Sequence, residues 1–160
     1  MSRAVVPDIN CVPAEGPNNA EIMLVGQNPG REELKIGKPF VGRAGKYLDS
    51  ALQKNGIDRR KLYITSVVKQ GTPHNRKPTK EEIRYWMPYL VEEINSIKPG
   101  IIVLMGAVAW ETPRLAGIRY IETYHPAAAM RFPKIKEKFE KDIQELKGSL
   151  TISRVDQSQG

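Results

Sequence analysis

Short apolar segments of strand length alternate along this chain with segments of helical periodicity. The apolar segments, rich in β-branched residues, are 22–25, 62–68, 101–105 and the weaker 118–124. Helical spacing of apolar residues marks 43–54, 79–97 and 134–147. Strands that alternate with helices are joined by right-handed crossovers, which place the strands in parallel. The pattern therefore predicts an α/β fold whose parallel sheet is covered by helices on both faces.

The length and composition of the chain predict a single domain. With 160 residues, of which 40% are hydrophobic, it can bury one proper core. Residues 1–20 contain prolines and glycines with little periodicity, so we expect an irregular lead-in there. We expect the domain itself over 21–148. Residues 149–160 are polar and are expected to form a frayed tail.

The charge of the chain favours a polyanionic partner. Its 25 Lys and Arg residues against 18 Asp and Glu residues give a net charge of +7, which assists encounter with nucleic acid. Many small proteins are basic without binding DNA, so the charge favours a nucleic-acid partner but does not identify one by itself.

Cysteine content and hydropathy limit the setting. Cys11 is the only cysteine, which excludes an intrachain disulfide and any metal cluster held entirely by cysteines of this chain. No apolar run reaches the ~20 residues of a membrane helix, and residues 1–12 lack the apolar core of a signal peptide. We expect a monomer in a reducing, cytoplasmic setting, without membrane contact.

Three loops that follow predicted strands carry the residues of chemical interest. They are 26–30, 66–76 and 125–131. The carboxyl ends of parallel strands meet at one edge of a sheet, where ligands bind. The first loop, Gly-Gln-Asn-Pro-Gly, turns tightly at its glycines but lacks the spacings of dinucleotide and triphosphate sites. Alone, it is typical of an ordinary strand-to-helix turn.

Two further motifs change that interpretation. Residues 39–45 read Pro-Phe-Val-Gly-Arg-Ala-Gly, and residues 125–131 read His-Pro-Ala-Ala-Ala-Met-Arg. With Ile-Thr-Ser-Val-Val-Lys and Asn-Arg-Lys-Pro between them, the chain from Glu21 to Pro133 resembles the uracil-DNA glycosylase superfamily, especially its thermostable branch that carries an iron–sulfur cluster. The resemblance implies a three-layer α/β/α sandwich with a central, mostly parallel four-stranded sheet. It also implies a DNA-repair enzyme that flips a damaged nucleotide out of DNA and hydrolyses its N-glycosidic bond.

The resemblance implies roles for residues of a base pocket. Phe40 would stack on the flipped base, and His125 would donate a hydrogen bond to the base carbonyl as negative charge develops there. Asn28 matches the position where superfamily members carry Asp or Asn to hold the attacking water. The iron–sulfur branch reads Gly-Glu-Ala-Pro-Gly in this loop, so its carboxylate falls on Gln27. We therefore assign the water to Asn28, and expect Gln27 and Gly26 to contact the base.

Basic and apolar residues on the same loops are expected to contact DNA. Met130 would fill the space that the flipped base leaves, and Arg131 would meet the phosphates or the minor groove. Arg43, Lys69 and Arg76 would contact phosphates, although each could instead be a solvated surface charge. The expected partner is DNA that contains a damaged base.

Two departures from the family pattern affect cofactor and substrate. Gln70 and Trp86 stand where the iron–sulfur branch has cysteines, and Cys11 has no cysteine partner. One thiolate cannot hold a four-iron cluster, so we expect no metal and a core role for Trp86. Ser66 replaces an Asn that reads the uracil edge with a donor and an acceptor, which one hydroxyl cannot reproduce. The substrate is either uracil, read partly through the backbone, or another base such as hypoxanthine, xanthine or mismatched thymine.

Three functions are compatible with these residues. The first is a monofunctional glycosylase that uses water and leaves an abasic site, since no lysine occupies an obvious nucleophile position. The second is a module that binds damaged DNA without catalysis, because Gln27 and Ser66 both replace functional groups. The third is a nucleotide-binding protein of flavodoxin-like shape with no DNA role, which would leave the Phe40 and His125 loops without a purpose. The presence of Asn28, Phe40 and His125 together favours the first.

Overall fold

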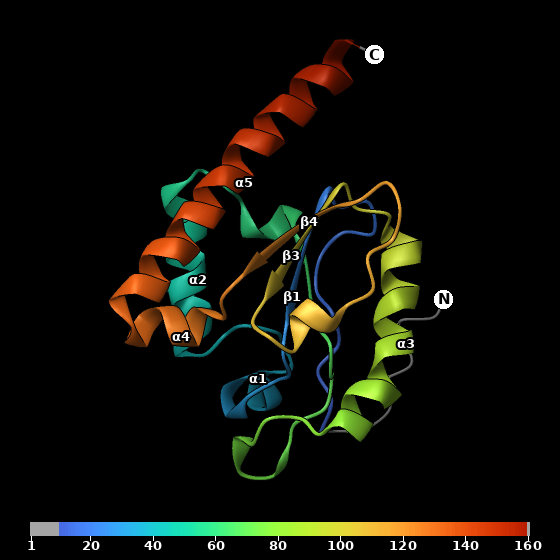
Figure 1. Ribbon diagram of the computed structural model, residues 1–160, viewed down its shortest axis with the longest axis vertical. Helices are drawn as coiled ribbons and strands as arrows, with labels where there is room; N and C mark the ends of the chain where they lie inside the picture. Colours follow the sequence, from blue (N-terminus) through green and yellow to red (C-terminus); the bar gives the residue numbers. More distant parts are fainter. Residues whose placement is uncertain (1–9, 160) are drawn as a thin grey trace.

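A parallel four-stranded sheet forms the centre of the computed structural model, which describes residues 10–159 and their side chains as far as residue 148 (Figure 1). The strands are β1 (Ile22–Gly26), β2 (Tyr63–Ser66), β3 (Ile101–Met105) and β4 (Arg119–Thr123). They follow the order β2-β1-β3-β4, and each neighbouring pair is parallel. The predicted α/β class and the parallel arrangement of the sheet are therefore confirmed.

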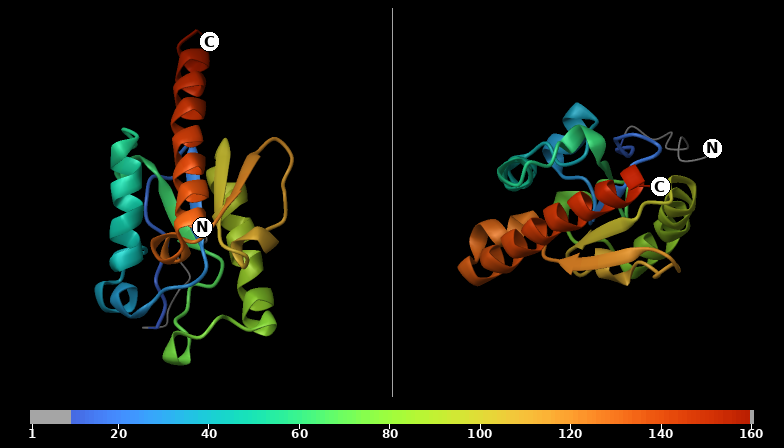
Figure 2. Two further views of the ribbon diagram at one scale, coloured as in Figure 1. Left: turned by 60° about the vertical axis from the view of Figure 1, so that its left-hand side comes forward. Right: turned by 90° about the horizontal axis from the view of Figure 1, so that it is seen from above.

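Helices cover both faces of this sheet (Figures 1 and 2). One face carries α2 (Arg43–Lys54), α4 (Pro126–Arg131) and α5 (Pro133–Gln159), and the other carries α3 (Lys80–Ile97). Successive side chains of a strand point to opposite faces, so Leu24 of β1 joins the core under α2 and α5 while Val25 joins the core under α3. The predicted three-layer sandwich is confirmed.

Local sequence signals located the long helices better than the short ones. The bounds of α2 agree with the prediction, and α3 begins after the capping box of Thr79 and Glu82, whose groups exchange hydrogen bonds of 2.8 and 3.1 Å. The predicted end of the last helix at residue 147 is wrong, because α5 continues through Gly148 to Gln159. Short segments that the sequence did not reveal are α1 (Arg31–Ile36), α4, η2 (Arg59–Lys61), η3 (Pro73–Asn75) and η4 (Ala109–Glu111).

The described part of the lead-in, residues 10–20, lies along the outer edge of β2. Isolated antiparallel bridges join Cys11 to Gln70 and Glu15 to Ile64. The Glu15 and Ile64 backbones exchange hydrogen bonds of 2.9 and 2.7 Å. This segment therefore pairs the polar groups of an edge strand that would otherwise be open. Residues 1–9 of the predicted lead-in lie outside the described residues.

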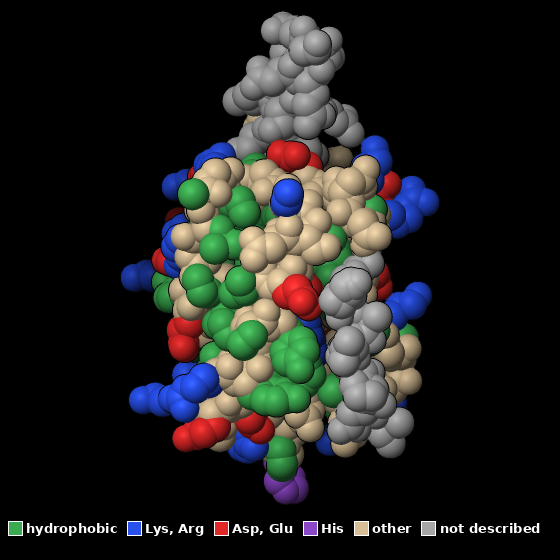
Figure 3. All heavy atoms as spheres, turned by 90° about the vertical axis from the view of Figure 1, so that its right-hand side faces the viewer, with side chains coloured by type: hydrophobic (Ala, Val, Ile, Leu, Met, Phe, Trp, Pro, Cys, Tyr) green, Lys and Arg blue, Asp and Glu red, His purple; other side chains and the backbone are tan. Residues whose placement is uncertain are grey.

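The surface beside α3 is partly apolar. Hydrophobic side chains gather on this side of the molecule among charged ones (Figure 3), and Tyr85 of α3 is 61% exposed. Within residues 10–159, no helix combines the length and the hydrophobicity needed to cross a membrane.

Candidate active site

A cavity of about 480 Å³ opens where β1 and β2 end. Its size is in the range of small-ligand sites. Residues from separate loops line it, and they include five residues predicted to be catalytic or to contact the base: Gln27, Asn28, Phe40, Ser66 and His125. The fold thus brings together the three loops that the sequence analysis singled out, along with the segment that carries Phe40.

Phe40 enters the cavity in an unusual backbone conformation. Its φ angle is +50°, in the left-handed region that residues other than Gly, Asn and Asp seldom adopt. The ring lies against Gly26, where an added Cβ would come within 2.6 Å of Cζ, so the end of β1 must be glycine for the ring to approach. The centroids of the Phe40 and His125 rings are 5.7 Å apart. Gly26 therefore shapes the pocket through its lack of a side chain.

His125 caps the amino end of α4 and presents one particular nitrogen. Its Nδ1 accepts a hydrogen bond of 3.0 Å from the Ala127 backbone N–H, so the proton of the neutral ring is on Nε2. Burial lowers the pKa of His125 from 6.5, while the Glu33 carboxylate acts in the opposite direction. A neutral imidazole that donates from Nε2 is the form expected near pH 7.

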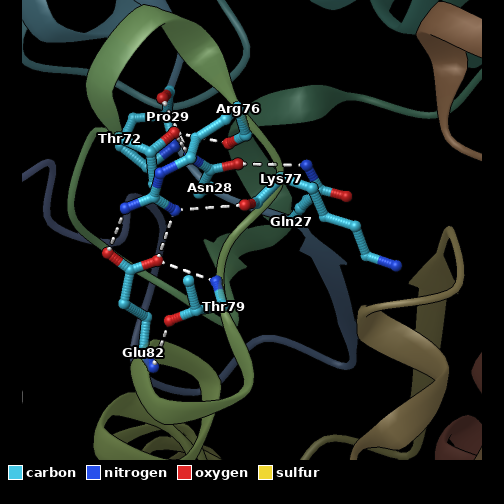
Figure 4. Close-up of polar contacts among 8 residues, drawn as sticks. All are labelled: Gln27, Asn28, Pro29, Thr72, Arg76, Lys77, Thr79 and Glu82. Carbon is cyan, nitrogen blue, oxygen red and sulfur yellow. Dashed lines mark hydrogen bonds and ion pairs between the residues drawn. The ribbon is translucent and has the colours of Figure 1, made fainter.

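The Asn28 side chain is oriented by its neighbours (Figure 4). Its Oδ1 accepts a hydrogen bond of 3.2 Å from Gln27 Nε2. Its Nδ2 donates to Thr72 Oγ1 over 3.4 Å and to the Pro29 carbonyl over 3.5 Å. The Thr72 hydroxyl in turn donates to the Arg76 carbonyl over 2.5 Å. The amide nitrogen is thereby engaged, and the oxygen keeps a lone pair that can accept from a water molecule.

The Ser66 hydroxyl uses its proton within the protein. Ser66 Oγ lies 2.8 Å from the Val68 carbonyl oxygen, which can only accept, so the hydroxyl is the donor. The lone pairs of Oγ are what Ser66 offers to the cavity that it lines. In this state Ser66 can accept a hydrogen bond from a ligand but cannot also donate one.

The prediction that Lys69 contacts phosphate is wrong. Lys69 is 3% exposed, and its Nζ lies 2.8 Å from Glu93 Oε1 and 2.5 Å from the Ser66 carbonyl. The Tyr63 and Thr65 hydroxyls donate to the same carboxylate over 2.6 and 3.0 Å. Burial lowers the pKa of the Lys69 ammonium, and Glu93 opposes that shift. A cation enclosed in this way holds the end of β2 and cannot reach DNA.

The other predicted DNA-contacting residues lie at the surface. The Arg76 guanidinium binds both oxygens of Glu82 over 2.8 and 3.0 Å (Figure 4), which lowers the pKa of Glu82 to about 2. Arg76 would have to share its charge between this carboxylate and a phosphate. Arg43 lines the mouth of the cavity, and Arg131 is exposed at the end of α4.

Several residues in and around the candidate site were not predicted from the sequence. Asn75 lines it with a φ of +57°, although the motif Asn-Arg-Lys-Pro had drawn attention to this segment. Phe132, which follows α4, is 53% exposed, and Met130 within α4 is 39% exposed, so both apolar side chains are accessible at the surface. Glu33 and Arg59 hold the Phe40 loop, and no local pattern marked either of them.

The residues at the positions of the iron–sulfur ligands do not fit a cluster. Within the described residues, no three His, Cys, Asp or Glu side chains gather so as to hold a metal ion. Gln70 bridges to Cys11 through the backbone, and the chain has no second cysteine. Trp86 is 6% exposed and packs against Tyr85 and Tyr89 with ring centroids 5.3 and 5.2 Å away. The predicted core role of Trp86 is confirmed.

Comparisons with known proteins show that the chain is similar to uracil-DNA glycosylases. A model of the uracil DNA glycosylase superfamily matches residues 13–147. The type-4 uracil-DNA glycosylase of Pyrobaculum aerophilum is 36% identical over 158 residues, which cover 84% of this chain and 80% of that protein. The type-4 enzyme of Thermotoga maritima is 38% identical, over 76% of this chain and 72% of its own length. A DNA polymerase of Bacillus phage SP01 is 33% identical over 81% of this chain, which corresponds to 16% of the polymerase.

Proposed function

The chain belongs to the uracil DNA glycosylase superfamily, and we propose that it releases a deaminated base, uracil first, from DNA in base-excision repair. One observation carries the proposal: Phe40, His125 and Asn28, which come from three different segments, meet at a single cavity. An aromatic face can stack on a flipped base, a neutral donor can stabilise the charge that develops on the departing base, and an amide oxygen can hold a water molecule.

In the proposed reaction, the flipped base stacks on Phe40 and its carbonyl accepts from His125 Nε2. The bond between C1′ and the base nitrogen breaks, and its electron pair leaves with the base, where the imidazole donor stabilises the charge. A water molecule held by Asn28 Oδ1 adds its oxygen to C1′ and loses a proton to solvent. An amide is a weak base, but an oxocarbenium-like sugar needs a well-placed water more than a strongly activated one.

The acceptor at Ser66 supports a substrate with an N–H beside its carbonyl. Uracil has such a group at N3, whereas cytosine has a lone pair there and would face the lone pairs of Ser66 Oγ. Hypoxanthine and xanthine also carry an N–H next to a carbonyl. We therefore propose uracil as the principal substrate and these deaminated purines as secondary ones.

Contacts with DNA are proposed for the surface around the cavity. Arg43 and Arg131 are placed for phosphates, and Met130 with Phe132 for the space that the flipped base vacates. The net charge of +7 supports binding that weakens as salt increases. We also propose that the chain works without an iron–sulfur cluster, since its only cysteine is Cys11. The predictions of a monomer and of a cytoplasmic setting stay predictions.

Base release from defined oligonucleotides tests the proposal. Single- and double-stranded substrates would carry uracil, hypoxanthine, xanthine or mismatched thymine, and alkali would cleave the abasic sites that form. We expect release of uracil by the wild-type chain and a loss of about 100-fold or more in the His125→Ala variant, with DNA affinity nearly unchanged. Tight, salt-sensitive binding without release of any base would contradict the proposal and favour a damage-binding module.

A further inference from the structure

The loop that presents Phe40 is held by two side chains of opposite charge that come from other parts of the chain. Arg59 of η2 donates to the Pro39 carbonyl over 2.5 Å and to the Phe40 carbonyl over 2.7 Å. Glu33 of α1 accepts from the Val41 N–H over 2.9 Å through Oε2. The peptide group between Pro39 and Phe40 is therefore bound at its oxygen. The peptide group between Phe40 and Val41 is bound at both its oxygen and its nitrogen.

Fixing these two peptide groups fixes the backbone of Phe40. The φ and ψ angles of a residue are set by the orientations of the two peptide planes that flank it. Phe40 has a φ of +50°, a conformation that is strained for a residue with a side chain and persists where the surroundings impose it. Gly45 packs so closely beneath that an added Cβ would lie 2.1 Å from the Phe40 oxygen. The loop is thus held from three sides.

Both charged side chains are themselves anchored. Arg59 also contacts Asp49 Oδ1 over 2.8 Å and Glu15 Oε2 over 3.5 Å, and its side chain is 19% exposed. Glu33 also accepts from the Gly30 N–H through Oε1 over 3.0 Å and from the Gly42 N–H through Oε2 over 2.8 Å. Gly30 and Gly42 precede α1 and α2, so the carboxylate lies between the amino ends of two helices, where negative charge is favourable.

The same contacts argue against Glu33 as the base that activates water. Three backbone N–H groups occupy its two oxygens, although the residue lies beside the cavity. A carboxylate held in this way is suited to fixing loops. It also connects the loop of Asn28, through Gly30, with the loop of Phe40, through Val41 and Gly42.

We propose that Glu33 and Arg59 are positioning residues that hold Phe40 in its strained conformation, ready to stack on a base before DNA binds. The proposal rests on the proposed function, because it assigns stacking to Phe40. Preorganisation of this kind avoids ordering the loop at the moment of binding. Neither side chain needs to contact the base. Arg59 acts through the Phe40 loop, whereas Glu33 also binds the Gly30 N–H of the loop that carries Asn28.

A double-mutant cycle with Phe40 tests this transmission. Single-turnover release of uracil would be measured at about pH 8, where His125 is neutral, for Arg59→Met, Arg59→Lys and Glu33→Gln, each alone and combined with Phe40→Ala. We expect each substitution alone to lower the maximal rate about tenfold, with less than about a threefold change in DNA affinity. In the Phe40→Ala background, Arg59→Met and Arg59→Lys should change the rate by less than about twofold, and Glu33→Gln should change it less than it does in the wild-type background. Lysine should not rescue Arg59, because one ammonium cannot bind two carbonyls and Asp49 with the geometry of a guanidinium.

Matched controls and outcomes separate this proposal from a general effect on folding. Arg60→Met removes the adjacent arginine, whose guanidinium binds Asp58 and whose side chain is 90% exposed. Glu81→Gln removes an acidic residue from the first turn of α3, and both controls should release uracil at the wild-type rate. Effects that add fully to Phe40→Ala overturn the positioning role while leaving the proposed function intact. No release by the wild-type chain overturns both.

Discussion

The two walls of the cavity, one at Phe40 and one at Ser66, are held by charged groups in opposite settings. Arg59, which holds the Phe40 wall, is partly exposed and binds backbone oxygens of a loop. Lys69 and Glu93, which hold the Ser66 wall, are 4% and 1% exposed in their side chains, and the ammonium binds the carbonyl at the end of β2. The first arrangement fixes a loop on the surface of the core, and the second is part of the core.

This difference predicts which property, stability or base release, changes when each wall is mutated. Removing one partner of a buried ion pair leaves an uncompensated charge in a medium of low polarity, so the free energy of unfolding falls sharply. Contacts nearer to water contribute less to stability, because solvent screens and replaces them. We therefore expect substitutions beneath Ser66 to act mainly on folding, and substitutions around Phe40 to act mainly on base release.

The largest effect is expected for Lys69→Met. It leaves the Glu93 carboxylate buried without its cation, and we expect the free energy of unfolding to fall by about 3 to 5 kcal/mol. Urea denaturation would measure the loss. Adding Glu93→Gln removes the orphaned charge but keeps an acceptor for the Tyr63 and Thr65 hydroxyls, so the double variant should recover more than half of it. A double variant that is no more stable than Lys69→Met would show that the pair is not what holds this wall.

Phe40→Ala is expected to affect uracil release strongly and the free energy of unfolding only weakly. Loss of base-on-aromatic stacking should raise the activation free energy of uracil release by about 1 to 3 kcal/mol. The free energy of unfolding should change much less than it does in Lys69→Met. Phe40→Leu is the matched control, because it keeps apolar packing against Gly26 and removes the aromatic face. Wild-type release by the leucine variant would indicate that the ring acts through packing and not through stacking.

The sequence predicted the buried frame and the loops, but not the long-range contacts. β1 and β3 were found because strands covered on both faces are uniformly apolar, and α3 because its cap and apolar face are local signals. Lys69 was misplaced because a lysine after a strand looks the same whether its ammonium meets solvent or a glutamate twenty-four residues later. Glu33 and Arg59 escaped notice for the same reason, since their partners in the Phe40 loop lie 8 and 19 residues away. The helices α1 and α4, at six residues each, are too short for periodicity to appear.

A smaller, chemically specific effect is expected at the Ser66 wall. Ser66→Asn supplies a donor beside the acceptor, which matches both O4 and N3–H of uracil, and should raise the rate of uracil release about tenfold. The ratio of the single-turnover rates of the variant and the wild-type chain measures this gain. Ser66→Ala removes the acceptor and should slow uracil release. A wild-type rate in the Asn variant would mean that Ser66 does not contact the edge of the base.

The smallest effect is the contribution of His125 to the pH dependence of stability. Burial lowers the pKa of His125 below 6.5 in the folded state, so the unfolded chain takes up a proton first as the pH falls. The stabilisation from the neutral ring is therefore fully present above about pH 6.5 and declines as the pH falls from there through the folded-state pKa. Protonation would also end the bond that Nδ1 accepts from the Ala127 N–H. Urea denaturation at several pH values should show a shallower acid-side slope for His125→Gln than for the wild-type chain. Equal slopes for His125→Gln and wild type would mean that the imidazole is as well solvated in the fold as in the unfolded chain, and its role as a neutral donor would lose its physical basis.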